Sequence, residues 1–492
     1  GIVGYVGAQQ AAPILLEGLQ KLEYRGYDSA GIAVLDGSTI ELAKACGEIK
    51  NLLAKTHDGS DLHGYIGLGH TRWATHGAPT EANAHPHVSN DGKFAIVQNG
   101  IIENFMELRE MLQAKGFRFH SETDTEVIVH LLDMYYTGDG NLKDTVMKTL
   151  GRLEGSYAIG ILCADCPEQM FLARNGCPLI IGVGAGENFF ASDVTALVSH
   201  TKNVVYLDDG ELAEVRADSY TVFDCTGKPI EKPVSRVAWD IEAAEKGGYE
   251  HFMLKEIMEQ PRAIKSTLDP RVKDHRVVFD ELKMTDAQLM GFNKIMITAC
   301  GSAFYAGQAG KYALEKLTHI PVDADLASEF RYRDPIVDEH TLMIIISQSG
   351  ETADTIAAIR EAQSKGAYVL SIVNVVGSTI ARISDDVIYT WAGPEIAVAT
   401  TKGYTTQVSV LYLLALYLGE KRGCLSREEA AKLTDDLMIL PQMVQRAIDL
   451  NPQIAQLAER YKNNPSLFFI GRNVDYAVCM EGSLKLKEIS YL

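Results

Sequence analysis

The second half of the chain repeats one pattern, in which an apolar strand is followed by a small-residue turn and an amphipathic helix. Strands that are apolar along their whole length are buried on both faces, which is typical of a parallel sheet. This half is therefore predicted to form an open, doubly wound α/β sheet. The strands, turns and helices of this pattern are, in chain order, 294–299, 300–302, 303–317, 342–346, 347–350, 352–365 and 368–373.

The first half has short β-type runs together with helical periodicity at 102–115 and 124–137, which predicts a layered α+β unit. The pattern breaks at 240–248, and a helix that resumes at 251–259 is expected to end at Pro261. Near the end of the sequence, a strand at 466–470, a Gly turn and a helix at 476–489 repeat the second-half pattern. The predicted divisions are 1–238, a linker at 239–260, a first α/β subdomain at 261–445, and the start of a second at 446–492.

Composition excludes several classes of protein. With 65 acidic and 46 basic side chains the net charge is -19, which disfavours binding to nucleic acids and to anionic membranes. The longest aliphatic run, 408–418, is shorter than the roughly 18 residues that a membrane span needs. The first residues lack the basic start of a signal peptide and the eight cysteines are scattered, so a cytoplasmic protein is expected. Cys163 and Cys166 are interpreted as structural, and no metal or cofactor is predicted.

Residues 70–77 in the first half concentrate two imidazoles, a guanidinium and two hydroxyls. The guanidinium of Arg72 offers a planar fork that fits the carboxylate of a free amino acid, and Asp124 can answer its α-ammonium group. These residues therefore predict an amino-acid site. The alternative is a polar loop whose hydroxyls satisfy its own polar groups.

Gln98, Asn99 and Gly100 follow a predicted strand. An Asn side-chain amide beside a Gly N–H can form an oxyanion hole for acyl transfer. The alternative is a type I′ hairpin turn, which Asn-Gly strongly favours. For the nearby residues 85–87 the sequence indicates no more than a turn.

Residues 347–352 in the second half lie between a strand and a helix, where free N–H groups and the helix dipole attract phosphate. Three hydroxyls add hydrogen-bond donors there without adding charge. Ligands of open α/β sheets bind at this end of the strands, although the segment could also serve only to cap its helix. Residues 300–302 and 400–402 can complete the pocket. The sequence has no nucleotide-binding glycine motif, so a nucleotide is not indicated.

The predicted helix at 476–489 carries Glu481, Lys485 and Glu488 on one side. The alternative is a solvated face of salt bridges. Because helical geometry directs Glu488 among apolar neighbours, its carboxylate is expected to be desolvated, with a raised pKa that suits proton transfer.

Six segments resemble the glucosamine-6-phosphate synthase family, and the match extends over essentially the whole chain. The resemblance implies glutamine-dependent conversion of fructose 6-phosphate to glucosamine 6-phosphate and glutamate, the first step of amino-sugar biosynthesis. It implies an N-terminal-nucleophile glutaminase of αββα layers followed by sugar-isomerase (SIS) subdomains with doubly wound parallel sheets. It also implies glutamine and fructose 6-phosphate as substrates, no cofactor, and a cytoplasmic homodimer. The six segments are 22–31, 69–77, 121–126, 328–333, 347–353 and 481–491.

The same resemblance implies a role for individual residues. Those that would bind glutamine are Arg72, Thr75, His76 and Asp124. The oxyanion hole would be formed by Asn99 and Gly100, and the ammonia channel would be gated by Trp73. The residues that would bind the sugar phosphate are Ser302, Ser347, Gln348, Ser349 and Thr352, with Thr400 near the sugar. Isomerisation would involve Lys485 and Glu488.

The sequence departs from the family pattern at its ends and at three internal positions. Members begin with a nucleophilic Cys where this sequence begins at Gly1, and they continue beyond Leu492 to a ring-opening His and an imine-forming Lys. A molecule of these 492 residues alone is therefore expected to lack the nucleophile and the C-terminal part, and to be inactive. The replacements at Gln98, Ala303 and Thr400 are expected to be tolerated.

Two other functions stay open at this level. A sugar-phosphate-binding regulator would use the α/β half alone, but no basic DNA-binding segment stands beside the acidic net charge. The chain could also be an inactive fragment of the synthase. A glutaminase coupled to phosphoribosyl transfer or to asparagine synthesis would share the first half. It would also need nucleotide or pyrophosphate loops, which the sequence lacks.

Overall fold

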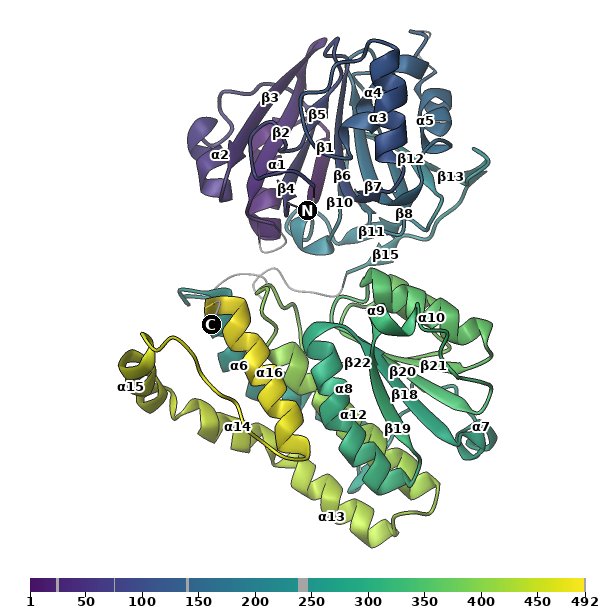
Figure 1. Ribbon diagram of the computed structural model, residues 1–492, viewed down its shortest axis with the longest axis vertical. Coiled ribbons are helices and arrows are strands. Elements are labelled where there is room, and N and C mark those ends of the chain that lie inside the picture. Colours follow the sequence, from purple (N-terminus) through teal and green to yellow (C-terminus); the bar gives the residue numbers. More distant parts are fainter. Residues whose placement is uncertain (24–25, 75, 139–140, 238–246, 491–492) are drawn as a thin grey trace. The chain divides into compact units, whose positions relative to one another are not determined.

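The computed structural model describes residues 1–23, 26–74, 76–138, 141–237 and 247–490 (Figure 1). The chain divides into two compact units, Gly1–Ile241 and Glu242–Leu492. The sequence-based boundary at 238, the first part of the expected linker and Thr75 lie outside the described residues. Among the described helices, none combines the length and the apolar character needed to cross a membrane.

The first unit contains two large antiparallel sheets. The order of the strands in each sheet differs from their order in the chain. As a result β1, the first strand of the chain, lies in the middle of the larger sheet, between β10 and β4. The eight-stranded sheet has the order β15 (Ser235–Arg236), β11 (Asn203–Tyr206), β9 (Ile180–Val183), β10 (Asn188–Ala191), β1 (Ile2–Val6), β4 (Ile66–Arg72), β2 (Ser29–Asp36) and β3 (Thr39–Cys46). The seven-stranded sheet has the order β14 (Pro229–Ile230), β13 (Tyr220–Phe223), β12 (Leu212–Arg216), β8 (Gln169–Asn175), β7 (Gly155–Cys163), β6 (Phe94–Ile102) and β5 (His87–Val88).

Three apolar clusters separate four layers in the first unit. One cluster, which includes Leu68 and Val97, fills the space between the two sheets. A second joins the larger sheet to its covering helices, and a third joins the smaller sheet to helices on its outer face. The αββα layering predicted by the resemblance is therefore confirmed (Figure 1). The covering helices are α1 (Ala11–Leu22) and α2 (Ile49–Lys55) on the larger sheet, and α3 (Phe105–Ala114), α4 (Glu126–Tyr135) and α5 (Leu142–Leu150) on the smaller one.

The second unit is built on a five-stranded sheet in which all neighbours are parallel. Alternate strand residues pack into two apolar clusters, one on each face, so the sheet is doubly wound as predicted. From β18 the chain passes first to β19 on one side of it and then to β20 on the other side. The switch point of the topology therefore lies between β18 and β20. The strand order is β19 (Val322–Leu326), β18 (Lys294–Ala299), β20 (Thr341–Ser347), β21 (Tyr368–Val373) and β22 (Asp386–Tyr389).

Helices cover both faces of this sheet. One face is covered by α6 (Phe252–Leu268), α7 (Asp286–Gly291), α8 (Gly301–Thr318) and α12 (Lys402–Lys421). The other is covered by α9 (Ala327–Phe330), α10 (Ala353–Ser364) and α11 (Thr379–Ile383). The aliphatic run in α12 forms a buried helix, as expected. The remaining elements are the hairpin β16 (Val272–Lys273) and β17 (Arg276–Val277), and the helices α13 (Arg427–Met438), α14 (Leu440–Ile448), α15 (Asn451–Tyr461) and α16 (Val474–Ser490).

Helix α6 continues through Pro261, where the sequence predicted an end. Pro261 cannot donate a hydrogen bond to the carbonyl of Ile257. The side-chain amide of Gln260 donates to that carbonyl instead, at 3.1 Å. The backbone acceptor that proline leaves unpaired is thereby satisfied, and the helix extends to Leu268.

The strand predicted at 466–470 does not form, and this prediction was wrong. Phe468 and Ile470 are 89% and 87% exposed. A strand needs a neighbour for its backbone hydrogen bonds, and no described strand lies beside this segment. The helix predicted at 476–489 does form, as α16, and it packs along α8.

Candidate active sites

The start of the chain lies beside the polar segment at the end of β4. Strands β1 and β4 pair antiparallel, with Ile2 opposite His70. The α-amine of Gly1 donates a hydrogen bond to the carbonyl of Thr71 at 2.6 Å. Burial lowers the pKa of His70 well below its usual value. The fold therefore brings the first residue and the 70–72 strand end together.

Asn99 and Gly100 lie within β6 and pair with β7, so the hairpin-turn alternative is wrong. The Oδ1 atom of Asn99 bonds to Nε2 of His70 at 2.9 Å. The Nδ2 group of Asn99 has no hydrogen-bond partner within the described chain, which leaves a donor for a ligand. Gly100 has a φ of +99°, and a Cβ there would lie 2.1 Å from the carbonyl oxygen of Ser156, so only glycine fits.

Arg72 and Asp124 share one buried polar region, as the sequence predicted. Asp124 accepts a hydrogen bond from the Ile102 N–H at 2.8 Å, and one of its oxygens lies 4.0 Å from Nδ1 of His76. Burial raises the pKa of Asp124, although Ile102, His76 and Arg72 oppose this. The Arg72 guanidinium donates to the carbonyls of His76, Gly77 and Ala78, so it braces this turn as well.

Trp73 and Thr75 complete the predicted set in this unit. Trp73 is 54% exposed, and its ring meets that of Tyr27 edge to face at 5.5 Å. Thr75 lies outside the described residues. Gln98 is buried and fully engaged: its Oε1 accepts from Thr125 at 2.6 Å, and its N–H donates to His85 Nδ1 at 3.2 Å. These hydrogen bonds satisfy polar groups of Gln98 and explain how this replacement is accommodated in a buried position.

Sequence reasoning missed a group of three buried imidazoles, His70, His85 and His87. The rings of His70 and His85 stack at 4.2 Å, and those of His85 and His87 meet at 4.9 Å. Burial lowers the pKa of all three, so they are neutral near pH 7. His87 and His85 also contact the hydroxyls of Thr123 and Thr125. The only available signal was the number of histidines near the strand ends.

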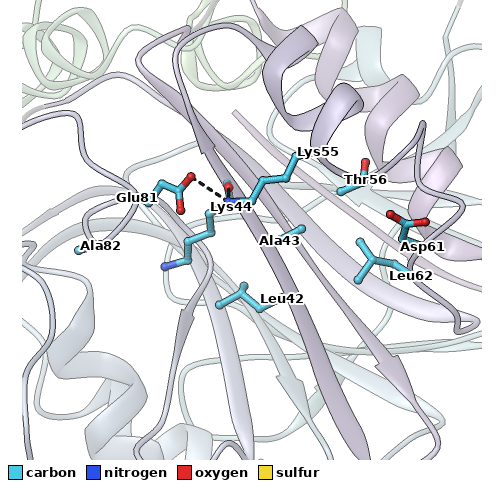
Figure 2. Close-up of a pocket in the computed structure, with 9 residues that line it drawn as sticks. All are labelled: Leu42, Ala43, Lys44, Lys55, Thr56, Asp61, Leu62, Glu81 and Ala82. Carbon is cyan, nitrogen blue, oxygen red and sulfur yellow. Dashed lines mark hydrogen bonds and ion pairs between the residues drawn. The ribbon is translucent and has the colours of Figure 1, made fainter.

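A separate pocket of about 510 Å³ in the first unit contains none of the predicted residues (Figure 2). Lys55 donates to the carboxylate of Glu81 at 2.8 Å and to the carbonyl of Lys44 at 2.6 Å. Burial lowers the pKa of Lys44 to about 8. Its charged lining side chains are those of Lys44, Lys55, Asp61 and Glu81.

In the second unit, residues 347–352 lie at the carboxyl end of β20, beside the switch point. The hydroxyls of Ser347 and Thr352 are 3.1 Å apart, and the Gly350 N–H donates to Ser347 Oγ at 3.0 Å. Ser349 Oγ accepts from the Glu351 N–H at 3.2 Å. The Thr352 side chain does not cap α10, although it stands at the N-cap position. Thr352 therefore does not act as a side-chain cap. The turn that carries the hydroxyls of Ser347, Ser349 and Thr352 is called the hydroxyl cradle below.

Gln348 of this turn and Thr400 before α12 both lie close to Gly403. Gln348 Oε1 accepts from Gln407 at 3.4 Å, while its Nε2 is buried without a partner in the described part of the chain. The Thr400 hydroxyl donates to the carboxylate of Glu395. The predicted residues of the 347–352 and 400–402 segments are thus together.

Helix α16 presents Glu481 to the site, and the expected environment of Glu488 was wrong. Glu481 is 5% exposed; burial raises its pKa, and the nearby Ser302 hydroxyl and Lys485 ammonium offset this only in part. Lys485 Nζ lies 3.6 Å from Glu481 and also contacts Glu488. The Glu488 side chain is 33% exposed and lies in the last turn of α16.

No group of three or more His, Cys, Asp or Glu side chains in the described ranges is placed to hold a metal ion. All eight cysteines are free, and burial raises the pKa of Cys163 to about 12. This thiol is therefore not activated for redox chemistry.

Comparison with known proteins identifies both halves. The glutamine amidotransferase domain matches residues 49–231, and the SIS domain matches residues 288–417. Curated relatives named glutamine–fructose-6-phosphate aminotransferase (isomerizing) match 100% of the chain. The protein of Caldanaerobacter subterraneus subsp. tengcongensis is 53% identical, and that of Clostridium tetani is 50% identical, with 81% of each relative covered.

One solved structure, the C-terminal domain of glucosamine-fructose-6-phosphate aminotransferase from Francisella tularensis, is 38% identical, with a TM-score of 0.49. The match covers 50% of this chain and 70% of that chain. The whole-length identity to the curated relatives decides the assignment: the chain belongs to the glutamine–fructose-6-phosphate aminotransferase (isomerizing) family.

Proposed function

We propose that this protein converts fructose 6-phosphate and glutamine to glucosamine 6-phosphate and glutamate. The first unit hydrolyses glutamine to glutamate and ammonia. The second unit condenses ammonia with the open-chain ketose, with loss of water, and moves a proton between C1 and C2 to give the amino sugar. The water consumed in the first step is released in the second, so the overall reaction balances.

The observation that carries this proposal is the position of Gly1 at the start of β1, next to the strand end that contains His70 and its partner Asn99. A Cys placed before Gly1 would continue β1 toward Arg72, so its thiol would lie next to a free Asn99 donor. The thiol attacks the side-chain amide carbon of glutamine, and the developing oxyanion is stabilised by Asn99 and the Gly100 N–H. Ammonia leaves, and water then releases glutamate from the thioester.

The remaining polar groups of the first unit bind the substrate. The buried carboxylate of Asp124 holds the α-ammonium group of glutamine. Arg72, His76 and Thr75 hold its α-carboxylate end. Trp73 acts as the gate on the path of ammonia.

The second unit binds the phosphate of the sugar in the hydroxyl cradle, where backbone N–H groups and hydroxyls supply donors. Ser302 and Gln348 also bind the phosphate, and Thr400 contacts the sugar. Glu488 moves the proton and Lys485 stabilises the negative charge that develops on oxygen. The protein acts as a cytoplasmic homodimer and requires no cofactor.

Isotope transfer tests this function. The full-length enzyme, with Cys before Gly1, is given fructose 6-phosphate and glutamine labelled with ¹⁵N in its side-chain amide. We expect ¹⁵N in the C2 amine of glucosamine 6-phosphate and one glutamate for each amino sugar. Glutamate release without labelled amino sugar would show that the second unit has another substrate.

A further inference from the structure

The carboxylate of Glu395 organises the start of α12. Its Oε1 accepts hydrogen bonds from the N–H groups of Thr401 at 2.8 Å and Gly403 at 3.0 Å. Its other oxygen, Oε2, accepts the hydroxyl proton of Thr400. Both oxygens are therefore engaged, and the Thr400 proton points at Glu395.

Gly403 shows how closely these groups surround one position. A Cβ on Gly403 would lie 2.4 Å from Glu395 Oε2, 2.7 Å from Thr400 Oγ1 and 2.7 Å from Gln348 Oε1. Only glycine leaves this position open. The Glu395–Thr400 pair thus lies against Gln348, which belongs to the segment that forms the hydroxyl cradle.

Two side chains of helix α6 bind the segment that contains Thr400. Glu256, which is 1% exposed, accepts hydrogen bonds from the N–H groups of Ile396 at 2.5 Å and Ala397 at 3.2 Å. Lys402, which is also buried, donates to Glu259 at 2.7 Å. The residues on both sides of Thr400 are therefore fixed, and its hydroxyl has little freedom to choose another acceptor.

We propose that Glu395 is a positioning residue that makes the Thr400 hydroxyl a hydrogen-bond acceptor toward the sugar. This inference rests on the proposed function of the second unit. A hydroxyl has one proton and two lone pairs, and a carboxylate only accepts. Once Thr400 donates to Glu395, it offers the ligand only lone pairs, which fit a sugar O–H and cannot bind a phosphate oxygen.

The two ends of the site then have opposite polarity. The cradle offers hydroxyl and N–H donors to the phosphate, and Gln348 Nε2 adds one free donor. At the Thr400 end, the negative charge of Glu395 repels phosphate and the lone pairs of Thr400 receive a hydroxyl proton. The site therefore selects a phosphate ester that also carries hydroxyl groups, and it fixes which end of that ester enters the cradle.

Glu395→Gln in the full-length enzyme tests this polarity. The glutamine Oε1 still accepts from Thr401 and Gly403, so its Nε2 must face Thr400 and donate to it. The Thr400 proton then turns toward the sugar. By calorimetry we expect affinity for fructose 6-phosphate to fall about ten- to hundredfold, and affinity for inorganic phosphate to change less than about twofold.

Two further variants separate polarity from structure. Glu429→Gln is the matched control, because Glu429 accepts from the hydroxyl and N–H of Ser426 at the start of α13, outside the cradle. It should leave affinity for the sugar unchanged. In a Thr400→Val background, Glu395→Gln should cause less than about a threefold loss of affinity, because no hydroxyl remains to be reversed.

Each of the other outcomes contradicts the inference. If Glu395→Gln lowers the affinity for inorganic phosphate as much as the affinity for fructose 6-phosphate, Glu395 only maintains the fold. The same conclusion follows if the loss of sugar affinity is as large in the Thr400→Val background as in the unsubstituted enzyme. If it leaves affinity for fructose 6-phosphate unchanged, the polarity is irrelevant. If the unsubstituted enzyme does not bind fructose 6-phosphate at all, the proposed function fails first.

Discussion

At the scale of single residues, helix α16 carries two carboxylates that the sequence does not distinguish but that differ in burial. Glu481 is buried, and burial raises its pKa, whereas Glu488 lies in the exposed last turn. Lys485 contacts both. Helical periodicity predicts that the three share one side of the helix, but burial depends on which other elements cover that side.

Substitution of each carboxylate tests the assignment of Glu488 as the base. In the full-length enzyme, Glu488→Gln should keep sugar binding and glutamine hydrolysis while turnover to glucosamine 6-phosphate falls by about 10²–10⁴, the usual contribution of a positioned acid–base group. Glu481→Gln should reduce turnover by less than about tenfold. Product assays that give the reverse order would make Glu481 the base.

The candidate sites were predictable where one short segment carries the chemistry. Arg72 and Asp124 come together because β4 and the segment before α4 end near one another, and their charge types pointed to an amino-acid ligand. The capping and hairpin alternatives could be excluded only from hydrogen bonds, since Thr352 and Asn99 carry the same local signals in either role. His85 and His87 were missed because their partners lie far away in the sequence.

At the scale of elements, strands buried on both faces were the most predictable feature. The apolar runs of β18 and β21 match the predicted residues at both ends, because a central parallel strand must be apolar throughout. Elements that depend on a distant partner were not predictable. Residues 466–470 have the composition of a strand but no described neighbour, and α6 passes Pro261 because a side chain replaces the missing backbone donor.

At the scale of the whole molecule, the two units should respond to pH in opposite directions. Burial lowers the pKa of His70, His85 and His87, so these imidazoles bind fewer protons in the folded first unit than in its unfolded chain, and their contribution to its stability grows as pH rises from about 5 to 7. Burial raises the pKa of Glu256 from 4.5 to about 7. The folded second unit therefore binds more protons and loses stability over the same range.

Calorimetric unfolding of the full chain between pH 5 and 7 tests this contrast. We expect one transition to rise in temperature with pH and the other to fall, with a contribution from Glu256 on the order of 3 kcal/mol. Glu256→Gln should flatten only the falling transition, because glutamine keeps an acceptor for the Ile396 and Ala397 N–H groups and does not titrate. Two transitions that move in the same direction would show that these histidines or Glu256 do not control the pH response of their units.

The glutaminase activity proposed for the first unit requires a nucleophile immediately before Gly1. The most direct measurement compares glutamate release from glutamine by two proteins that differ only in this residue, one with Cys and one with Ser, each with a free α-amine. An α-amine with a pKa of about 7.7–8.0 can accept the thiol proton near neutral pH. We expect hydrolysis by the Cys protein and little by the Ser protein; equal rates in the two would show that this residue is not the nucleophile.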